Sequence, residues 1–376
     1  MYGDWLIKLL LRTMRIAVIH HIKASDYAEY LSALVNSQAM QKDFAVKVWS
    51  YSIPASQQYI PDDAVVYIIM EANSRFWVRW WYAVKLPAIL KKIGASAVLD
   101  LNGITPVKTI LPKITAFPET FFAGNKQKGV NDFAKQQLAQ SISNTSKIVM
   151  HSADKASAFK NVPEKRIEVI PFTPPSAFRT FEWHEKIMIK AQQADNKEYF
   201  IAVLEDDAEG IFVRLLKAFT KFKAWQQSSM QLLILPKFES FSPAIRQKHG
   251  SYKYREDVRL LEDLEESQVA SVLASAYAMV LTWASLPDLV VLTAALQCSL
   301  PVISLNNSDV LEYAGDAVVY VDDETVDALA AAMIQLYKDE DLHGRLKEAG
   351  KNRCGLLNRN EYEMRFWRIL ETAACS

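Results

Sequence analysis

The chain has 376 residues, of which 50% are hydrophobic and 23% charged, a composition typical of a folded protein rather than a disordered one. Its length exceeds what one core usually holds, so two domains are expected. Its 43 basic and 43 acidic side chains cancel, which argues against general nucleic-acid binding. Only three cysteines occur, and their wide spacing excludes a disulfide framework and a zinc cluster and fits a reducing, cytoplasmic compartment.

Residues 1–13, MYGDWLIKLLLRT, precede the first predicted strand. They are too few and too charged for a membrane helix, and they lack a small-residue cleavage site for secretion. Two interpretations of this extension remain open. It is either a short interfacial helix with its apolar residues on one side, or an artefact of start-site choice, with translation beginning at Met14.

From Met14 onward, short apolar runs alternate with longer helical patterns. The first series of predicted strands is Ile16–Ile19, Ala45–Trp49, Val65–Met70, Ala97–Leu99, Ile114–Phe117, Lys147–Met150 and Ile167–Ile170, with helices at Ser25–Gln41 and Asp132–Ser143. The second series of strands is Tyr199–Leu204, Gln231–Leu235, Val258–Leu261, Ala278–Thr282, Val302–Leu305 and Ala317–Val321. Helices are expected between these strands at Gly210–Gln226, Glu266–Ser275, Asp288–Cys298 and Thr325–Tyr337.

This alternation predicts an α/β fold of two Rossmann-like, doubly wound domains with parallel sheets. Ligands of such sheets bind beyond the carboxyl ends of the strands, so the expected site is a cleft that both sheets face. The expected divisions are an extension at 1–13, a first domain at 14–178, a linker at 179–198, a second domain at 199–350 and C-terminal helices at 351–376 that pack back on the first domain.

Several motifs of the second half follow one another in a recognisable order. Leu215–Phe219 fit an L-x-x-A-F helix signature, and the run SLPVISLNNSDVLEYAGDAVVYVDD contains Pro301, Val302, Ser308, Glu312, Gly315, Asp316 and Ala317. These motifs resemble the donor-binding domain of retaining GT-B glycosyltransferases of family 4, the glycosyl transferase group 1 type. The first half, with MRIAVIHH, DLNG and KRIEVIPF in the expected order, is similar to the acceptor domain of that family.

The resemblance implies a GT-B fold and transfer of a sugar from a nucleotide-sugar to a glycan or lipid-linked acceptor, as in polysaccharide biosynthesis. It also implies that no cofactor and no metal is needed. A transferase of this type works by electrostatic stabilisation of the departing diphosphate.

The acidic pair that the family places around the donor is changed in this chain. Counting back from Pro301, Leu286 stands where the first glutamate is expected and Ala294 where the second is expected. An alanine side chain cannot accept a hydrogen bond from a ribose hydroxyl, and losing such a charged acceptor costs about 1.5–3 kcal/mol of binding.

The cations that clamp the donor diphosphate are changed as well. Glu205 and Glu209 stand nearest to the family's Arg and Lys, and a carboxylate about 4 Å from a phosphate oxygen repels it by about 4 kcal/mol. Lys237 or Arg214, from a neighbouring turn, is a candidate for replacing the lost charge. Ser308 and Glu312 complete the expected donor-binding set.

The acceptor side departs from the family in the same direction. The family's His-Asp pair is replaced by Pro118 and Glu119, and its first Gly-Gly loop by His20, His21 and the two residues that follow. If acid–base chemistry survives, His20, His21 and Glu119 are the candidate catalytic residues, because they lie beyond strand ends. The alternative is that they are ordinary loop and turn residues.

The segment Arg75–Pro87 places three tryptophans among basic residues. A helix there would put Trp77, Trp81 and Lys85 on one face, with Phe76, Trp80 and Val84 beside it. One interpretation is a membrane-interface or lipid-linked acceptor surface. The other is a helix whose aromatic side chains pack on the sheet while Arg75 and Arg79 stay hydrated.

Two functions therefore stay open. The first is a divergent glycosyltransferase of hexosyltransferase type with eroded donor motifs, and the second is a catalytically silent GT-B scaffold that binds a glycan or partners an active glycosyltransferase. The expected location is the cytoplasm, with peripheral contact at the inner face of the membrane as a further hypothesis, and no nucleic-acid partner is expected.

Overall fold

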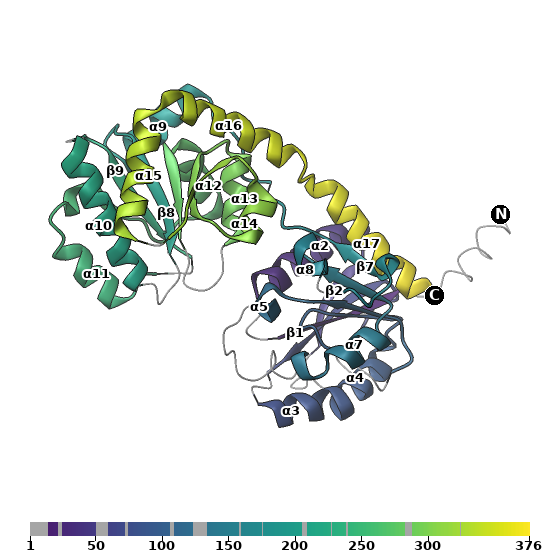
Figure 1. Cartoon of the computed structure of the whole chain (residues 1–376). Coiled ribbons are helices and arrows are strands. Elements are labelled where there is room, and N and C mark those ends of the chain that lie inside the picture. Colours follow the sequence, from purple (N-terminus) through teal and green to yellow (C-terminus); the bar gives the residue numbers. More distant parts are fainter. Residues whose placement is uncertain are drawn as a thin grey trace, which may run out of the picture. The chain divides into compact units, whose positions relative to one another are not determined.

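The computed structural model describes residues 14–21, 25–49, 59–71, 74–105, 109–122, 134–157, 159–174, 176–204, 209–226, 228–237, 240–282, 288–323 and 325–376. The extension at 1–13 lies outside them. The chain forms two compact units (Figure 1). The first ends at Pro171 and also includes Asn360–Ser376, and the second spans Phe172–Arg359.

The first unit contains a seven-stranded parallel sheet, sheet A, with strand order β2-β3-β1-β4-β5-β6-β7. Its inner strands are buried along most of their length, which explains why they occur in the sequence as uninterrupted apolar runs. The strands are β1 (Arg15–His21), β2 (Ala45–Trp49), β3 (Ala64–Met70), β4 (Ala97–Asp100), β5 (Lys113–Ala116), β6 (Lys147–Met150) and β7 (Ile167–Val169).

The helices of the first unit have clear local signals. The Ser25 hydroxyl caps the first of them by accepting a hydrogen bond from the Ala28 amide at 3.2 Å, and Gly94 ends another in the left-handed conformation, at φ 64°. The helices are α2 (Asp26–Gln41), α3 (Arg75–Trp80), a π-helix (Trp81–Lys85), α4 (Leu86–Ile93), α5 (Glu119–Phe122), α7 (Leu138–Asn144), α8 (Ala153–Ser157) and α17 (Arg359–Cys375).

The aromatic segment that contains α3 is buried only in part. Trp77 and Trp81 were expected on one face, and they differ in burial: Trp77 is 56% exposed whereas Trp81 is buried. The difference arises because only the part of the segment from Val78 onward is packed against the core of the unit.

Helix α17 (Arg359–Cys375) returns the chain to the first unit (Figure 1). Lys42 donates a charged hydrogen bond of 2.9 Å to Glu371 in this helix. Met364 is 55% exposed, because it lies outside the buried face of the helix. That face contains Phe366, Trp367 and Leu370.

The second unit contains a six-stranded parallel sheet, sheet B, with strand order β10-β9-β8-β11-β12-β13, the order of a doubly wound fold. The fully buried aromatic side chains of α10 and β8 form much of its core. The strands are β8 (Tyr199–Leu204), β9 (Gln231–Pro236), β10 (Val258–Leu260), β11 (Ala278–Leu281), β12 (Val302–Leu305) and β13 (Val318–Val321).

The helices of the second unit include one in the stretch expected to be a linker. Within residues 179–198, α9 (Trp183–Gln193) begins at a capping box formed by Glu182 and Glu185 and packs against α12. The other helices are α10 (Glu209–Gln226), α11 (Pro243–Gly250), α12 (Glu266–Ser275), α13 (Leu289–Gln297), α14 (Ser308–Ala314), α15 (Val326–Lys338) and α16 (Glu340–Gly355).

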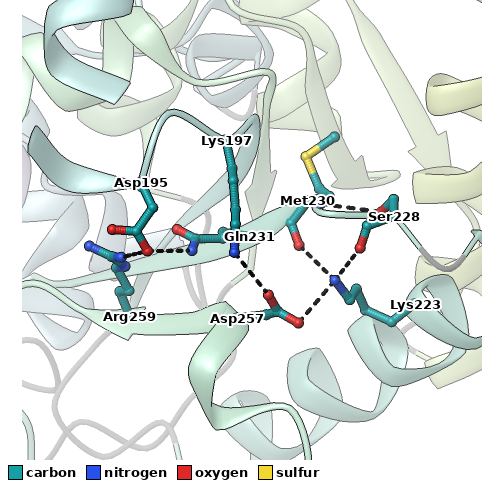
Figure 2. Close-up of polar contacts among 8 residues, drawn as sticks. All are labelled: Asp195, Lys197, Lys223, Ser228, Met230, Gln231, Asp257 and Arg259. Carbon is teal, nitrogen blue, oxygen red and sulfur yellow. Dashed lines mark hydrogen bonds and ion pairs between the residues drawn. The ribbon is translucent and has the colours of Figure 1, made fainter. Parts of the chain in front are cut away.

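A polar network joins the amino ends of β8, β9 and β10 (Figure 2). The buried ammonium of Lys223, in α10, contacts the Asp257 carboxylate at 3.0 Å and also donates to the carbonyl oxygens of Ser228 and Met230. Beside it, Asp195 accepts hydrogen bonds from Arg259 and Gln231. This network satisfies groups at the edge of the sheet opposite to the one where ligands are expected. Its full membership is Asp195, Lys197, Lys223, Ser228, Met230, Gln231, Asp257 and Arg259.

None of the helices in these described ranges combines the length and the apolar character needed to cross a membrane.

Candidate functional site

The carboxyl edge of sheet B is where the donor-side residues were expected. Strand β8 lies between β9 and β11, so the strand order reverses at β8, and ligands of doubly wound sheets bind at such a point. Three helices, α10, α13 and α14, follow strands β8, β11 and β12 and begin at this edge. Their first amide groups carry partial positive charge and favour anions.

An ion pair occupies this edge. The Lys237 ammonium, directly after β9, lies 3.0 Å from the Asp288 carboxylate, directly before α13. The second carboxylate oxygen of Asp288 accepts a hydrogen bond of 3.0 Å from the Val291 amide and so caps α13. Both side chains are largely buried, at 17% and 10% exposure. The position where α13 would bind a phosphate is therefore already filled by a carboxylate that also neutralises Lys237.

Of the two acids expected in place of the diphosphate clamp, Glu209 is described by the structure and Glu205 is not. Glu209 begins α10 and forms an ion pair of 3.0 Å with Lys248 of α11, in which both side chains are 40–50% exposed. A surface pair of this kind contributes little to stability. Glu205 lies outside the described residues, as does Leu286.

Three further expected donor-side residues lie on helices. Ala294 is buried inside α13 and offers no polar atom. Ser308 is the first residue of α14, and Glu312 lies one turn later, where its backbone carbonyl accepts a hydrogen bond from the Arg353 guanidinium. Ser308 therefore lies at the end of α14 that favours anions.

The carboxyl edge of sheet A holds the residues expected for acid–base chemistry. Glu119, after β5, accepts a hydrogen bond of 3.2 Å from the Tyr27 amide in the first turn of α2. Burial, followed by the charge of Asp26, raises the pKa of Glu119 above its ordinary value, while His151 acts in the opposite direction. A carboxyl with a raised pKa is able to carry a proton closer to neutral pH than an ordinary glutamic acid.

The two histidines end β1, and β4 lies between β1 and β5 in the sheet. Strands β1 and β5 are therefore two strand spacings apart, or about 10 Å. Burial lowers the pKa of His20, which favours the neutral imidazole, and His21 is buried. The three candidates thus share one edge of sheet A.

Strand β4, which lies between β1 and β5, ends in a buried carboxyl group, that of Asp100. It accepts hydrogen bonds from the backbone amides of Asn102, at 2.8 Å, and Ile104, at 3.1 Å, and from the Tyr82 hydroxyl. Complete burial raises the pKa of Asp100 to about 7 despite these donors. The DLNG motif is thus a closed turn built around one carboxyl group.

Two residues of these edges were not assigned a role from the sequence. Asp288 begins the predicted helix Asp288–Cys298, and an Asp directly before an apolar helical run is a recognisable helix start. His151 follows β6, and its ring lies 5.5 Å from that of Tyr27, edge to face. Its position after a strand of the first series was the available signal.

The described portions of the chain contain no group of three or more His, Cys, Asp or Glu side chains placed to hold a metal ion.

Comparison with known proteins finds a family match in the second half of the chain. Residues 184–353 match the model of the family described as glycosyl transferases group 1. No curated protein matches the sequence.

Solved structures share the fold over almost the whole chain. A glycosyltransferase from Rickettsia africae ESF-5 is similar with a TM-score of 0.71 and 13% identity, over 96% of this chain and 98% of that one. The sucrose-phosphate synthase of Thermosynechococcus elongatus has a TM-score of 0.70 and 15% identity, over 96% and 98% of the two chains. Anabaena HepE in complex with UDP-glucose has a TM-score of 0.67 and 10% identity, over 96% and 100%.

These matches confirm the GT-B fold expected from the sequence and the resemblance to the group 1 type. Residues 184–353 therefore resemble the glycosyl transferases group 1 family, within a chain that has the GT-B fold.

Proposed function

We propose that the protein transfers a sugar from a nucleotide-sugar to a glycan or lipid-linked acceptor, with retention of configuration as in family 4. The observation that carries this proposal is the group 1 match across residues 184–353, which contain the carboxyl edge of sheet B with the starts of α10, α13 and α14. Solved relatives of this fold include HepE, whose structures hold UDP-glucose or UDP.

In this proposal Lys237 holds the donor diphosphate. Its ammonium lies at the carboxyl edge of sheet B and already contacts an anion, the Asp288 carboxylate. A diphosphate would replace Asp288 as the partner of Lys237, and Ser308 at the start of α14 would add a donor to a phosphate oxygen. The enzyme would thus bind its donor by exchange of one anion for another.

The second candidate is a catalytically silent scaffold, and the cap of α13 by Asp288 favours it. A carboxylate about 4 Å from a phosphate oxygen repels it by about 4 kcal/mol at an effective dielectric constant of 20. If Asp288 stays in place, this repulsion and the neutralised Lys237 exclude the donor. Such a protein would retain the fold for binding a glycan or for partnering an active transferase.

A thermal-shift screen with UDP-, GDP- and dTDP-sugars separates the two candidates. A ligand at 100 times its Kd stabilises the folded state by about 2.7 kcal/mol, which is a measurable rise in Tm. We expect one nucleotide class to raise the Tm of the wild type, and Lys237→Ala to abolish that rise. The matched control is Lys217→Ala, which removes an exposed lysine of α10. No rise with any nucleotide-sugar at millimolar concentration would favour the silent scaffold.

A charge reversal tests where the diphosphate clamp lies. Glu205→Arg combined with Glu209→Lys restores the charges that the family places there, so we expect tighter binding of nucleoside diphosphates by calorimetry. Unchanged affinity would show that the clamp is not formed by these two positions.

A further inference from the structure

The residues from Arg75 to Ile93 form one continuous helical segment, in which α3, the π-helix and α4 follow without a break (Figure 1). Its inner side packs into the core of the first unit through Val78, Trp81, Tyr82, Leu86, Ile89, Leu90 and Ile93. Its outer side carries four large apolar side chains that face solvent. We call these the aromatic face: Phe76 at 71% exposure, Trp77 at 56%, Trp80 at 42% and Val84 at 52%.

The three aromatic side chains of the aromatic face contact one another. The rings of Phe76 and Trp77 lie 5.6 Å apart, and those of Trp77 and Trp80 lie 5.8 Å apart, both edge to face. They form a contiguous apolar surface, whereas exposed hydrophobic residues of ordinary monomeric proteins are scattered singly. A surface of this kind marks a site of association with a protein, a ligand or a membrane.

The charges on this helical segment have one sign. Residues 72–99 contain five basic side chains and no Asp or Glu, although the whole chain has no net charge. Arg79, Lys91 and Lys92 are exposed. The Lys92 ammonium lies 5.2 Å from the centre of the Trp49 ring, so the cations also extend beside the edge strand β2. The partner of this face must therefore be apolar at its centre and anionic around it.

We propose that the aromatic face binds the surface of a bilayer that contains anionic phospholipids. Tryptophan rings favour the boundary between headgroups and acyl chains, and lysine and arginine side chains favour anionic headgroups. The segment lies in the interface rather than crossing it, because its inner side is committed to the core of the unit. A second copy of the chain fits this face less well, since a symmetric contact would oppose the same basic side chains. This proposal does not depend on the proposed sugar transfer.

Co-sedimentation with sucrose-loaded vesicles tests the proposal on the full chain. One set of vesicles contains phosphatidylcholine alone, and the other contains equal parts of phosphatidylcholine and phosphatidylglycerol. We expect binding to the mixed vesicles, weakening as salt is added, and little binding to phosphatidylcholine alone. Replacing Trp77 and Trp80 together by Ser should lower the partition coefficient about tenfold or more. These side chains are exposed, so the substitutions leave the core intact.

Matched controls distinguish binding through the aromatic face from nonspecific adsorption to the vesicles. Trp183→Ser removes a tryptophan that is 77% exposed in α9, in the other unit, and should leave binding unchanged. Arg79→Glu with Lys91→Glu should abolish binding to the mixed vesicles, whereas Lys217→Glu with Lys221→Glu, the same change of net charge at two exposed positions of α10, should not.

Two results would overturn the proposal. One is a wild-type protein that stays in solution with the mixed vesicles, or that binds them equally well after the Trp77 and Trp80 substitutions. The other is a concentration-dependent dimer in sedimentation velocity that these substitutions dissolve while vesicle binding is absent. That second result would assign the face to self-association.

Discussion

Replacing Asp100 by Asn should change how the stability of the first unit depends on pH. The pKa of a carboxyl group in the unfolded chain is 3.8, and burial raises the pKa of Asp100 to about 7 in the folded protein. Well below pH 4 the group is protonated in both states and has no effect. As pH rises from about 4 to about 7, the unfolded chain releases the proton while the folded protein keeps it, so the wild type loses stability. Asn cannot titrate, so the variant should escape this loss.

The expected size follows from the two pKa values. Each pKa unit corresponds to about 1.4 kcal/mol, so the wild type should lose about 4 kcal/mol relative to Asp100→Asn between pH 4 and pH 7. Above pH 7 the difference should become constant. Asn fits the turn, because its side-chain oxygen can accept the hydrogen bonds from the backbone amides of Asn102 and Ile104.

Urea denaturation followed by tryptophan fluorescence at a series of pH values measures this difference. The second unit unfolds in both proteins, so its own pH dependence cancels in the comparison. Asp62→Asn, at a side chain that is 76% exposed, is the matched control and should parallel the wild type. Tyr82→Phe removes a hydroxyl that favours the ionised carboxyl, and the loss of stability should then extend to higher pH. If the Asp100→Asn curve also parallels the wild type, Asp100 is ionised in the folded protein and the reasoning fails.

Five other substitutions test the remaining features. Lys223→Met leaves the Asp257 carboxylate and two carbonyl oxygens without a buried ammonium. It should therefore lower the free energy of unfolding of the second unit, measured by calorimetry, by about 2–4 kcal/mol. Adding Asp257→Asn to the same chain should recover part of that loss. Asp288→Ser keeps an oxygen that caps α13 but removes the negative charge, so UDP should bind about tenfold more tightly by calorimetry, a gain of about 1.4 kcal/mol. Equal affinity would mean that the carboxylate does not oppose the nucleotide. Gly94→Ala should destabilise the first unit by about 1 kcal/mol, because Gly94 has a φ of 64° and an added Cβ would lie 2.8 Å from an arginine side chain. Gly344→Ala, in α16 with open space around it, should instead stabilise by about 0.5–1 kcal/mol.

The strands were predictable because strands covered on both faces need uninterrupted apolar runs. Tyr199–Leu204 and Lys147–Met150, for example, begin and end at the residues expected from the sequence. Helix α9 was not predicted, because its sequence WHEKIMIKAQQ has no strong apolar stripe and none of its residues is buried. The signal that was available is the pair Glu182 and Glu185, three residues apart, which forms the capping box of α9.

The candidate site was predictable in its place but not in its chemistry. The doubly wound pattern located the carboxyl edge of sheet B, and Lys237 was named there as a cation. The partner of Lys237 could not be predicted from the sequence. Asp288 is 51 residues away along the chain, and the strand order of sheet B is what brings the two side chains together. In the same way, the raised pKa of Asp100 arises from complete burial, which the DLNG motif does not reveal.

The return of the chain to its first unit has a consequence during synthesis. The ribosome completes residues up to Pro171 early, but the helix that contains Trp367 emerges only after the entire second unit has been made. Until then the surface around Phe44, whose ring lies 5.2 Å from that of Trp367 in the finished protein, has no cover. The second unit is contiguous and can finish first, so a nascent chain should expose this surface to proteases and chaperones until translation ends. Loss of the carboxyl-terminal residues from Trp367 onward would make that temporary exposure permanent.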